Sequence, residues 1–290
     1  MKQGRMMLLA LALSCGTAQL PAPGLALLAG QARAQGSADI SALSHALMIS
    51  LQMEILRDEG LTNGQELAAD LPGNGAAGIW ARRLDRVYDA VGMEKTYAGA
   101  LAQDLEGDPQ TVEASLAFFT SDLGRRILEL ELSARRALED DAVKAAAKRA
   151  WEGLPMKNPV RRGLFDRLMA ANDLIETNVM GALNANLAFL MGLHAAGDNR
   201  LALPETEALA LVWSSEADTR AAAIDWLYPF LTLAYEPLSE ADLRAYVAFS
   251  ESAEGRRLNA AMFRAFDTLY TGLSQEVGRA FGAALQGDDI

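Results

Sequence analysis

Apolar residues recur three and four positions apart from Ser41 onward, which is the spacing of helices that bury one face. No stretch alternates apolar and polar residues over enough positions to predict a strand. Turn-forming residues interrupt the helical pattern at residues 60–64, 72–75, 107–109, 155–159, 197–204 and 237–239. Alanine and leucine dominate, whereas β-branched and aromatic residues are sparse. The sequence therefore predicts an all-α fold of eight to ten helices.

The sequence matches itself at an offset of 131 residues, without a gap through its central part. The offset pairs Tyr97 with Tyr228, Phe118 with Phe249, Ser121 with Ser252, Gly124 with Gly255, Arg125 with Arg256 and Arg126 with Arg257. The turn positions and the apolar face both stay in register. The repeat therefore predicts an internal duplication that produces two tandem helical-bundle modules, over residues 35–154 and 155–290.

Each copy contains a short helix followed by a longer one. We expect N-terminal caps for these helices at Asp108, Ser121, Ser239 and Ser252, with Asp242 completing a capping box at Ser239. Gly124 and Gly255 would lie in the first turn of the longer helix, where a missing side chain lets another backbone approach. The longer helix of the second copy carries a core-facing stripe at Leu258, Met262, Phe266, Leu269, Leu273, Val277 and Phe281.

These residues resemble a bacterial family, the domain of unknown function 2059. Its motif, Phe-Tyr-x-Ser-Pro-x-Gly-Lys-Lys, is matched at Phe118, Ser121, Gly124, Arg125 and Arg126, and again at Phe249, Ser252, Gly255, Arg256 and Arg257. The chain departs from it where the family often has tyrosine (Phe119, Ser250) and proline (Asp122, Ala253). Members of the family are typically exported and helical, with no established activity. The resemblance thus implies location and fold, and it implies no mechanism.

The first 34 residues are typical of a signal peptide. Lys2 and Arg5 form a basic start, residues 6–13 form an apolar core, and residues 32–34 supply the small-x-small pattern that is cleaved before Gln35. Two alternatives stay open, namely acylation of Cys15 as in a lipoprotein, and an uncleaved anchor over residues 6–30. We expect a periplasmic protein, with membrane contact only if the N-terminus is retained or lipidated.

Charge and cysteine content exclude several classes of function. The chain has 26 basic and 38 acidic residues. Cleavage after residue 34 removes Lys2, Arg5 and Arg33, which leaves 23 basic residues against 38 acidic ones and a net charge of −15. Such a surface repels nucleic acid and anionic lipid. Because Cys15 is the only cysteine, the mature chain has no thiol for catalysis or metal binding.

No motif predicts a catalytic site, a cofactor or a metal. The chain has no phosphate-binding loop, nucleophile elbow or His-Glu-x-x-His sequence. His45 and His194 lie in the opening helices of the two copies, but no carboxylate stands beside them at ligand spacing. We interpret both histidines as ordinary, partly buried helix residues.

The paired arginines of the repeated motif, Arg125-Arg126 and Arg256-Arg257, are also candidates for anion binding. Glu129, Glu131 and Glu254 are close enough in sequence to pair with them. We therefore expect structural ion pairs, with the motif residues serving packing and chain turning.

Residues 177–197 carry no formal charge, and their length alone admits a membrane span. Three asparagines and a histidine within the segment argue against it. We expect a central helix buried by the others, and a second interpretation has this helix line an apolar cavity.

The leading functional hypothesis is a non-enzymatic periplasmic or envelope-associated protein that acts through contacts with another protein. The alternative is a carrier that holds a small apolar or lipid-like ligand between helices. A hydrolase that uses carboxylates is a third class, although nothing in the sequence singles out a pair.

Overall fold

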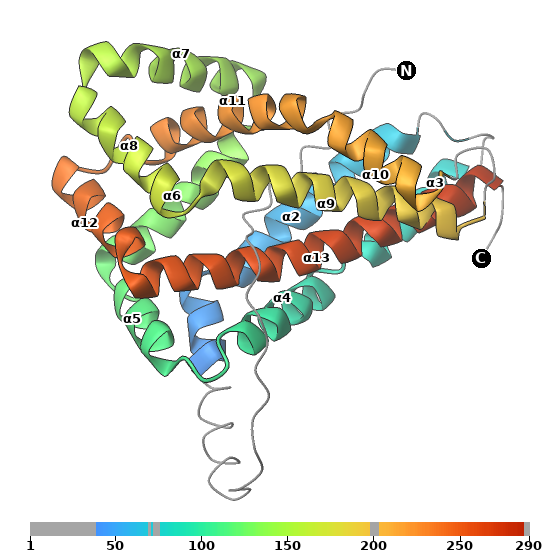
Figure 1. Cartoon of the computed structure of the whole chain (residues 1–290), viewed down its shortest axis with the longest axis horizontal. Helices are drawn as coiled ribbons and strands as arrows, with labels where there is room; N and C mark the ends of the chain where they lie inside the picture. The colour runs from blue at the N-terminus through green and yellow to red at the C-terminus, as the bar shows by residue number, and fades with distance from the viewer. Residues whose placement is uncertain (1–38, 69–70, 72–75, 198–202, 287–290) are drawn as a thin grey trace, which may run out of the picture.

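The computed structural model describes residues 39–68, 71, 76–197 and 203–286, so the predicted signal peptide lies outside the described residues. The described chain is helical throughout, which confirms the all-α prediction (Figure 1). A helical stretch over residues 39–46 precedes twelve helices in the described part. These are α2 (Ile49–Leu67), α3 (Ala76–Val87), α4 (Ala90–Asp104), α5 (Pro109–Phe119), α6 (Asp122–Ala137), α7 (Asp141–Lys157), α8 (Pro159–Ala171), α9 (Leu174–Ala195), α10 (Glu205–Ser214), α11 (Glu216–Ala234), α12 (Glu240–Glu251) and α13 (Ala253–Gln286).

The helix count exceeds the predicted eight to ten because the chain also breaks outside the predicted interruptions, for example at Asp89 before α4 and at Asp140 before α7. Asp173 separates α8 from α9 with a left-handed backbone (φ 48°), and Ser215 separates α10 from α11. The opposite error occurs at Gly60 and Gly64, where α2 continues through the predicted break. A Cβ on Gly60 would lie 2.2 Å from the ring of Tyr88, so this glycine makes room for a neighbouring helix instead of ending its own.

The predicted caps are confirmed. The Ser239 side chain accepts from the backbone N–H of Asp242, whose carboxylate accepts from the backbone N–H of Ser239, as in a capping box. Asp108 accepts from the N–H of Thr111 and precedes Pro109 at the first helical position. These caps fix where the short helices α5 and α12 begin.

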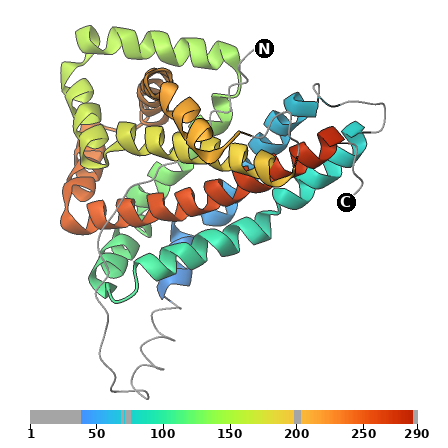
Figure 2. The same cartoon turned by 45° about the vertical axis from the view of Figure 1, so that its right-hand side comes forward.

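The longest helix, α13, runs the length of the molecule between α9 on one side and α4 on the other (Figures 1 and 2). Glycines bring α9 and α13 into backbone contact, because a Cβ on Gly192 would lie 2.1 Å from the Gln275 carbonyl oxygen. A Cβ on Gly278 would lie equally close to the carbonyl oxygen of Phe189. The predicted apolar stripe of α13 faces the core along its whole length. The uncharged segment over residues 177–197 is thus largely a central helix, as expected.

Two hydrophobic cores result, and each draws on both halves of the chain. The first joins α2, α3 and α4 to the apolar stripe of α13. The second joins α8, α9, α11 and α12 to Ile127 and Ala134 of α6. Helices α6 and α13 occupy equivalent places in the repeat, and each packs across the boundary between the halves. The proposed boundary after residue 154 lies inside α7, and as a division into modules it stays a prediction.

Among the described residues, no helix combines the length and the apolar character needed to cross a membrane.

Candidate functional site

The repeated motif brings its two copies into direct contact. The rings of Phe118 and Phe249 stack face to face, with centroids 4.1 Å apart and an interplanar angle of 7°. These residues occupy the same position in the repeat. A residue that contacts its own equivalent lies near a two-fold axis, as at an isologous interface. The stack is the contact that an approximate two-fold relation between the predicted halves would produce.

Serine and glycine of the motif form the same tight corner in both copies. The Ser121 hydroxyl donates to the carbonyl oxygen of Phe118 (2.6 Å) and accepts from the N–H of Gly124 (3.1 Å). The Ser252 hydroxyl repeats both bonds, at 2.6 and 2.9 Å. Both glycines are buried against the end of the preceding helix, where a side chain has no room. The expected close backbone approach is thus present, and the approaching backbone is that of the preceding helix.

The second arginine of each pair crosses to the other half. Arg126 donates to the carbonyl oxygen of Pro237, in the loop before α12 (2.9 Å). Arg257 forms ion pairs with Asp104 (3.1 Å) and Asp108 (3.4 Å), at the two ends of the loop before α5. The two arginines thus make reciprocal contacts between the halves.

The first arginine of each pair stays within its own copy. Arg125 pairs with Asp122, and Arg256 donates to the carbonyl oxygen of Glu251 (2.7 Å). The expected glutamate partners were wrong, because Glu131 accepts from tyrosines and Glu254 accepts from Gln110.

A cavity of about 150 Å³ lies beside the stacked phenylalanines, between the two halves. Four pairs of residues that the 131-residue offset makes equivalent line it together. They are Phe119 with Ser250, Leu128 with Asn259, Glu131 with Met262, and Arg135 with Phe266. The cavity therefore lies between α6 on one wall and α13 on the other.

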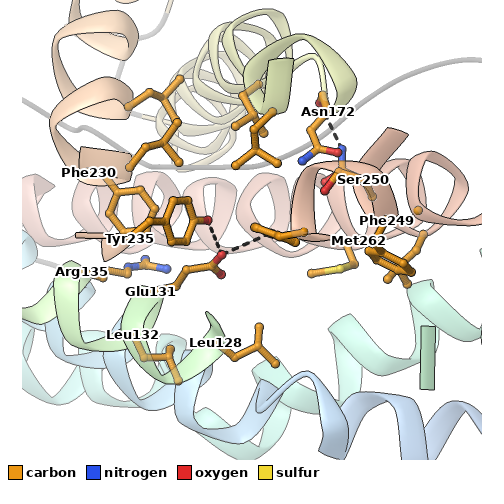
Figure 3. A pocket seen from close by; sticks show the side chains of 18 of the residues that line it. Leu128, Glu131, Leu132, Arg135, Asn172, Phe230, Tyr235, Phe249, Ser250 and Met262 are labelled. Atoms are coloured by element: carbon orange, nitrogen blue, oxygen red, sulfur yellow. Dashed lines mark hydrogen bonds between the residues drawn. The ribbon is translucent and has the colours of Figure 1, made fainter. Parts of the chain in front are cut away.

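The two walls differ in chemistry. Where α6 presents Glu131 and Arg135, α13 presents Met262 and Phe266 at the equivalent positions. Figure 3 shows Glu131 and Arg135 at one end of the cavity with Tyr235 and Phe230, and Met262 with Phe249 toward the other end. The two charged residues thus lie at one end of a lining that is mainly leucine and aromatic side chains, and Gln52, Asn172, Ser250 and Asn259 add neutral polar groups to it.

Glu131 is held by two tyrosines of the other half. The hydroxyls of Tyr235 (2.5 Å) and Tyr246 (3.2 Å) both donate to its Oε1 (Figure 3). Burial raises the pKa of Glu131, and the two hydrogen bonds oppose this rise only in part. Burial, together with the nearby charge of Glu131, also raises the pKa values of both tyrosines well above their usual range. The tyrosines consequently stay protonated and act as donors.

Arg135 is the other charged residue in the lining, and its charge is already balanced. Its guanidinium donates two hydrogen bonds to the carboxylate of Glu59 in α2 (2.7 and 2.6 Å). Burial disfavours the charged guanidinium, but Tyr270 and Glu59 outweigh this effect and raise the pKa of Arg135. Glu131 forms no ion pair with any described residue, so it is the carboxylate on which a ligand can act.

Aromatic rings surround the remaining space. Trp226 and Phe230 of α11 stack on each other with centroids 4.6 Å apart, and both are half-buried. Phe249 and Tyr246 of α12 line another side. Such rings offer both apolar contact area and negative π faces.

The sequence analysis missed the role of Glu131 and its tyrosines. A signal was present, because Leu128, Glu131, Leu132 and Arg135 follow the helical spacing of a buried face. Charged residues on such a face require partners, and they often mark a site. Tyr235 and Tyr246 carry no comparable signal, since their approach to α6 depends on the packing of the two halves.

The histidines are placed differently from the expectation. His45 and His194 are both exposed, whereas we expected partial burial. Among the described residues, no group of three or more histidine, cysteine or acidic side chains is arranged to hold a metal ion.

Comparison with known proteins finds that one part of the chain is similar to a family. Residues 92–152 match DUF2059, described as an uncharacterized protein conserved in bacteria. The matched segment contains the first copy of the motif together with Glu131 and Arg135. The second copy has no match of its own, so the duplication stays a prediction. No curated protein and no solved structure matches the chain.

Proposed function

We propose that this chain is an exported, non-enzymatic protein that holds a small and mostly apolar molecule in the cavity between its two halves. The observation that carries the proposal is the cavity itself, whose lining is mainly leucine and aromatic side chains, with its two charged residues, Glu131 and Arg135, at one end. A cavity of about 150 Å³ takes a molecule the size of benzene. Half-buried residues such as Trp226 and Met262 border it, so a longer ligand can extend toward the surface.

The composition of the cavity lining favours binding over catalysis. Its described lining contains one carboxylate, Glu131, whereas hydrolysis by carboxylates uses two groups with separate roles. Export rests on the secretion signal expected in residues 1–34, and the periplasm is the compartment that this signal favours.

Ligand-dependent stabilisation tests the proposal. A molecule that binds only the folded state raises the melting temperature. We expect toluene and benzyl alcohol to raise the melting temperature of the full-length protein. Met262→Trp, which fills the cavity, should remove this effect. Met156→Trp is the matched control, because Met156 is 92% exposed on another helix.

Native mass spectrometry of protein isolated gently from the periplasmic fraction provides a second test. We expect a co-purified small molecule that Met262→Trp does not retain. The proposal fails if wild-type protein carries no such molecule and none of the probes stabilises it.

A second candidate is the protein-contact role at the envelope, and it rests on a different surface. Helix α10 exposes Leu209 (42%), Leu211 (53%) and Trp213 (51%). Leu209 and Trp213 lie four residues apart and so share one face of the helix, and exposed apolar side chains on a common face often mark a contact with another macromolecule. A photo-crosslinker at position 213 should then give one discrete product in periplasmic extract, while the same group at the exposed Lys144 gives none. Equal labelling at both positions would exclude this role for α10.

A further inference from the structure

We infer that the cavity selects an organic cation, specifically a small aromatic amine, whose ammonium group binds the carboxylate of Glu131. This inference rests on the proposed function, since it names the class of ligand that the cavity takes.

The hydrogen-bond geometry leaves one acceptor for the ligand. Tyr235 and Tyr246 both donate to Oε1 of Glu131, and Oε2 forms no hydrogen bond with the described residues. An ammonium group has donors and no acceptor, so it matches the free oxygen without competing for the tyrosines. A ligand carboxylate would instead place a second anion beside Glu131, which the low local dielectric makes costly.

The charges around the site favour a cation. The titratable and charged side chains that face Glu131 are Tyr235 and Tyr246 from the second half and Arg135 from its own helix. Arg135 is neutralised by Glu59, and the tyrosines stay protonated. With ionised Glu131, the cavity holds one net negative charge. The acidic chain as a whole also raises the local concentration of cations.

The aromatic lining suits the rest of such a ligand. Trp226, Phe230 and Tyr246 line the same cavity as Glu131, and their faces attract a cation as well as an aryl group. An aryl ring packed among these side chains and the leucines of α6 would place a short amine arm at the polar end. Benzylamine combines the two groups in a molecule close to benzene in size.

Protonation of Glu131 gives the inference a second readout. Burial raises the pKa of Glu131, so the empty protein keeps this group neutral to a higher pH than usual. The affinity for a cation should therefore rise as the pH increases through the raised pKa, and level off above it. Tyr246→Phe removes a hydrogen bond that lowers this pKa, so the rise should move to higher pH.

The experiment compares three probes of similar shape by titration calorimetry with the full-length protein. These are benzylamine (cationic), benzyl alcohol (neutral) and benzoate (anionic). We expect benzylamine to bind about tenfold or more tightly than benzyl alcohol at pH 8, as a charge-assisted hydrogen bond would give. Benzoate should bind most weakly. Glu131→Gln should abolish the preference for the amine and its pH dependence while it still binds benzyl alcohol.

Glu129→Gln is the matched control, because Glu129 is exposed on the same helix and should leave all three affinities unchanged. Glu131→Gln should also fold. Since the folded-state pKa of Glu131 is raised, its contribution to stability is present at low pH and is lost as the pH rises through that pKa. The neutral amide avoids this loss, so at pH 8 the free energy of unfolding of Glu131→Gln should equal or exceed that of wild type.

The outcomes separate the two proposals. Binding of benzyl alcohol as tight as that of benzylamine, or a preference for the amine that survives Glu131→Gln, overturns the choice of a cation but leaves the cavity a binding site. Failure of all three probes to bind overturns the choice of a cation, and together with the absence of a co-purified molecule it also overturns the proposed function.

Discussion

The glycine at the motif corner is needed because it has no side chain. A Cβ on Gly255 would lie 1.9 Å from the carbonyl oxygen of Phe249, and the equivalent distance at Gly124 is 2.2 Å. Neither glycine has a left-handed backbone, so conformational freedom is not the reason for its presence. Glycine is needed because the helix starts directly against the end of the preceding helix, which leaves no room for a side chain.

This reason predicts a contrast between two glycines of α13. Gly255→Ala should lower the free energy of unfolding by about 3 kcal/mol or more, because backbone atoms must move to admit the methyl group. Gly272→Ala should raise it by about 0.5–1 kcal/mol, since nothing lies within 4 Å of the added carbon and alanine favours the helix. Urea denaturation followed by circular dichroism measures both. Similar losses in the two variants would contradict the packing explanation.

At the scale of single residues, the sequence predicted helix caps but not hydrogen bonds between residues far apart in the chain. Asp108, Ser121, Ser239 and Ser252 each accept from the backbone N–H three positions on, so their local spacing was sufficient. The partner of Glu131 lies more than a hundred residues along the chain, at Tyr235 and Tyr246. Local pattern contains no information on such a pairing.

Among the helices, α6 and α13 determine how the halves fit together. Each follows a short capped helix, and each packs against helices of the other half as well as of its own. The second motif arginine of each copy contacts the other half. Arg126 binds the loop before α12, and Arg257 binds the loop before α5. Among the described residues, the contacts of the first motif arginine lie within its own corner.

The two neighbouring arginines of α13 should consequently respond differently to the same substitution. Arg257→Met should lower the free energy of unfolding by about 1 kcal/mol, because it leaves Asp108 without this ion pair and loosens the hold on Asp104. Added salt should reduce this loss, since the pairs are only partly buried. Arg256→Met should change the value by less than about 0.5 kcal/mol, as for an ordinary surface site. Thermal denaturation at low and high salt checks the difference, and equal losses would exclude a bridging role for Arg257.

Helix boundaries were predictable only where proline or a capping side chain marks them in the sequence. Proline and a capping aspartate or serine end one helix and start the next at residues 107–109 and 237–239, as expected. The same reasoning wrongly predicted a break at the glycines of α2. In sequence, a glycine that makes room for a neighbouring side chain cannot be told from a glycine that ends a helix. The difference depends on which helix packs against it, and the sequence of α2 does not contain that information.

At the scale of the whole molecule, the repeat offset predicted which positions are equivalent but not how the halves interleave. Two independent bundles and two interleaved halves have the same hydrophobic pattern, because both bury the same faces. The choice depends on where α13 packs, and its stripe faces the helices of the first half. The cavity follows from this interleaving, since its two walls come from equivalent helices of different halves.

Interleaving of this kind predicts that the two cores unfold together. Trp80 is buried in the first core against Phe281 of α13, and Trp226 packs against the second core. Variants that keep only one of these tryptophans should show the same urea midpoint by fluorescence. Leu164→Ala, which removes a buried side chain of the second core, should lower stability by about 2–5 kcal/mol and shift both midpoints equally. A midpoint for Trp80 that stays in place while that of Trp226 falls would mean that the halves are separate folding units. In that case α6 and α13 would contribute little to the core they cross into, and the cavity between the halves would not be a rigid site.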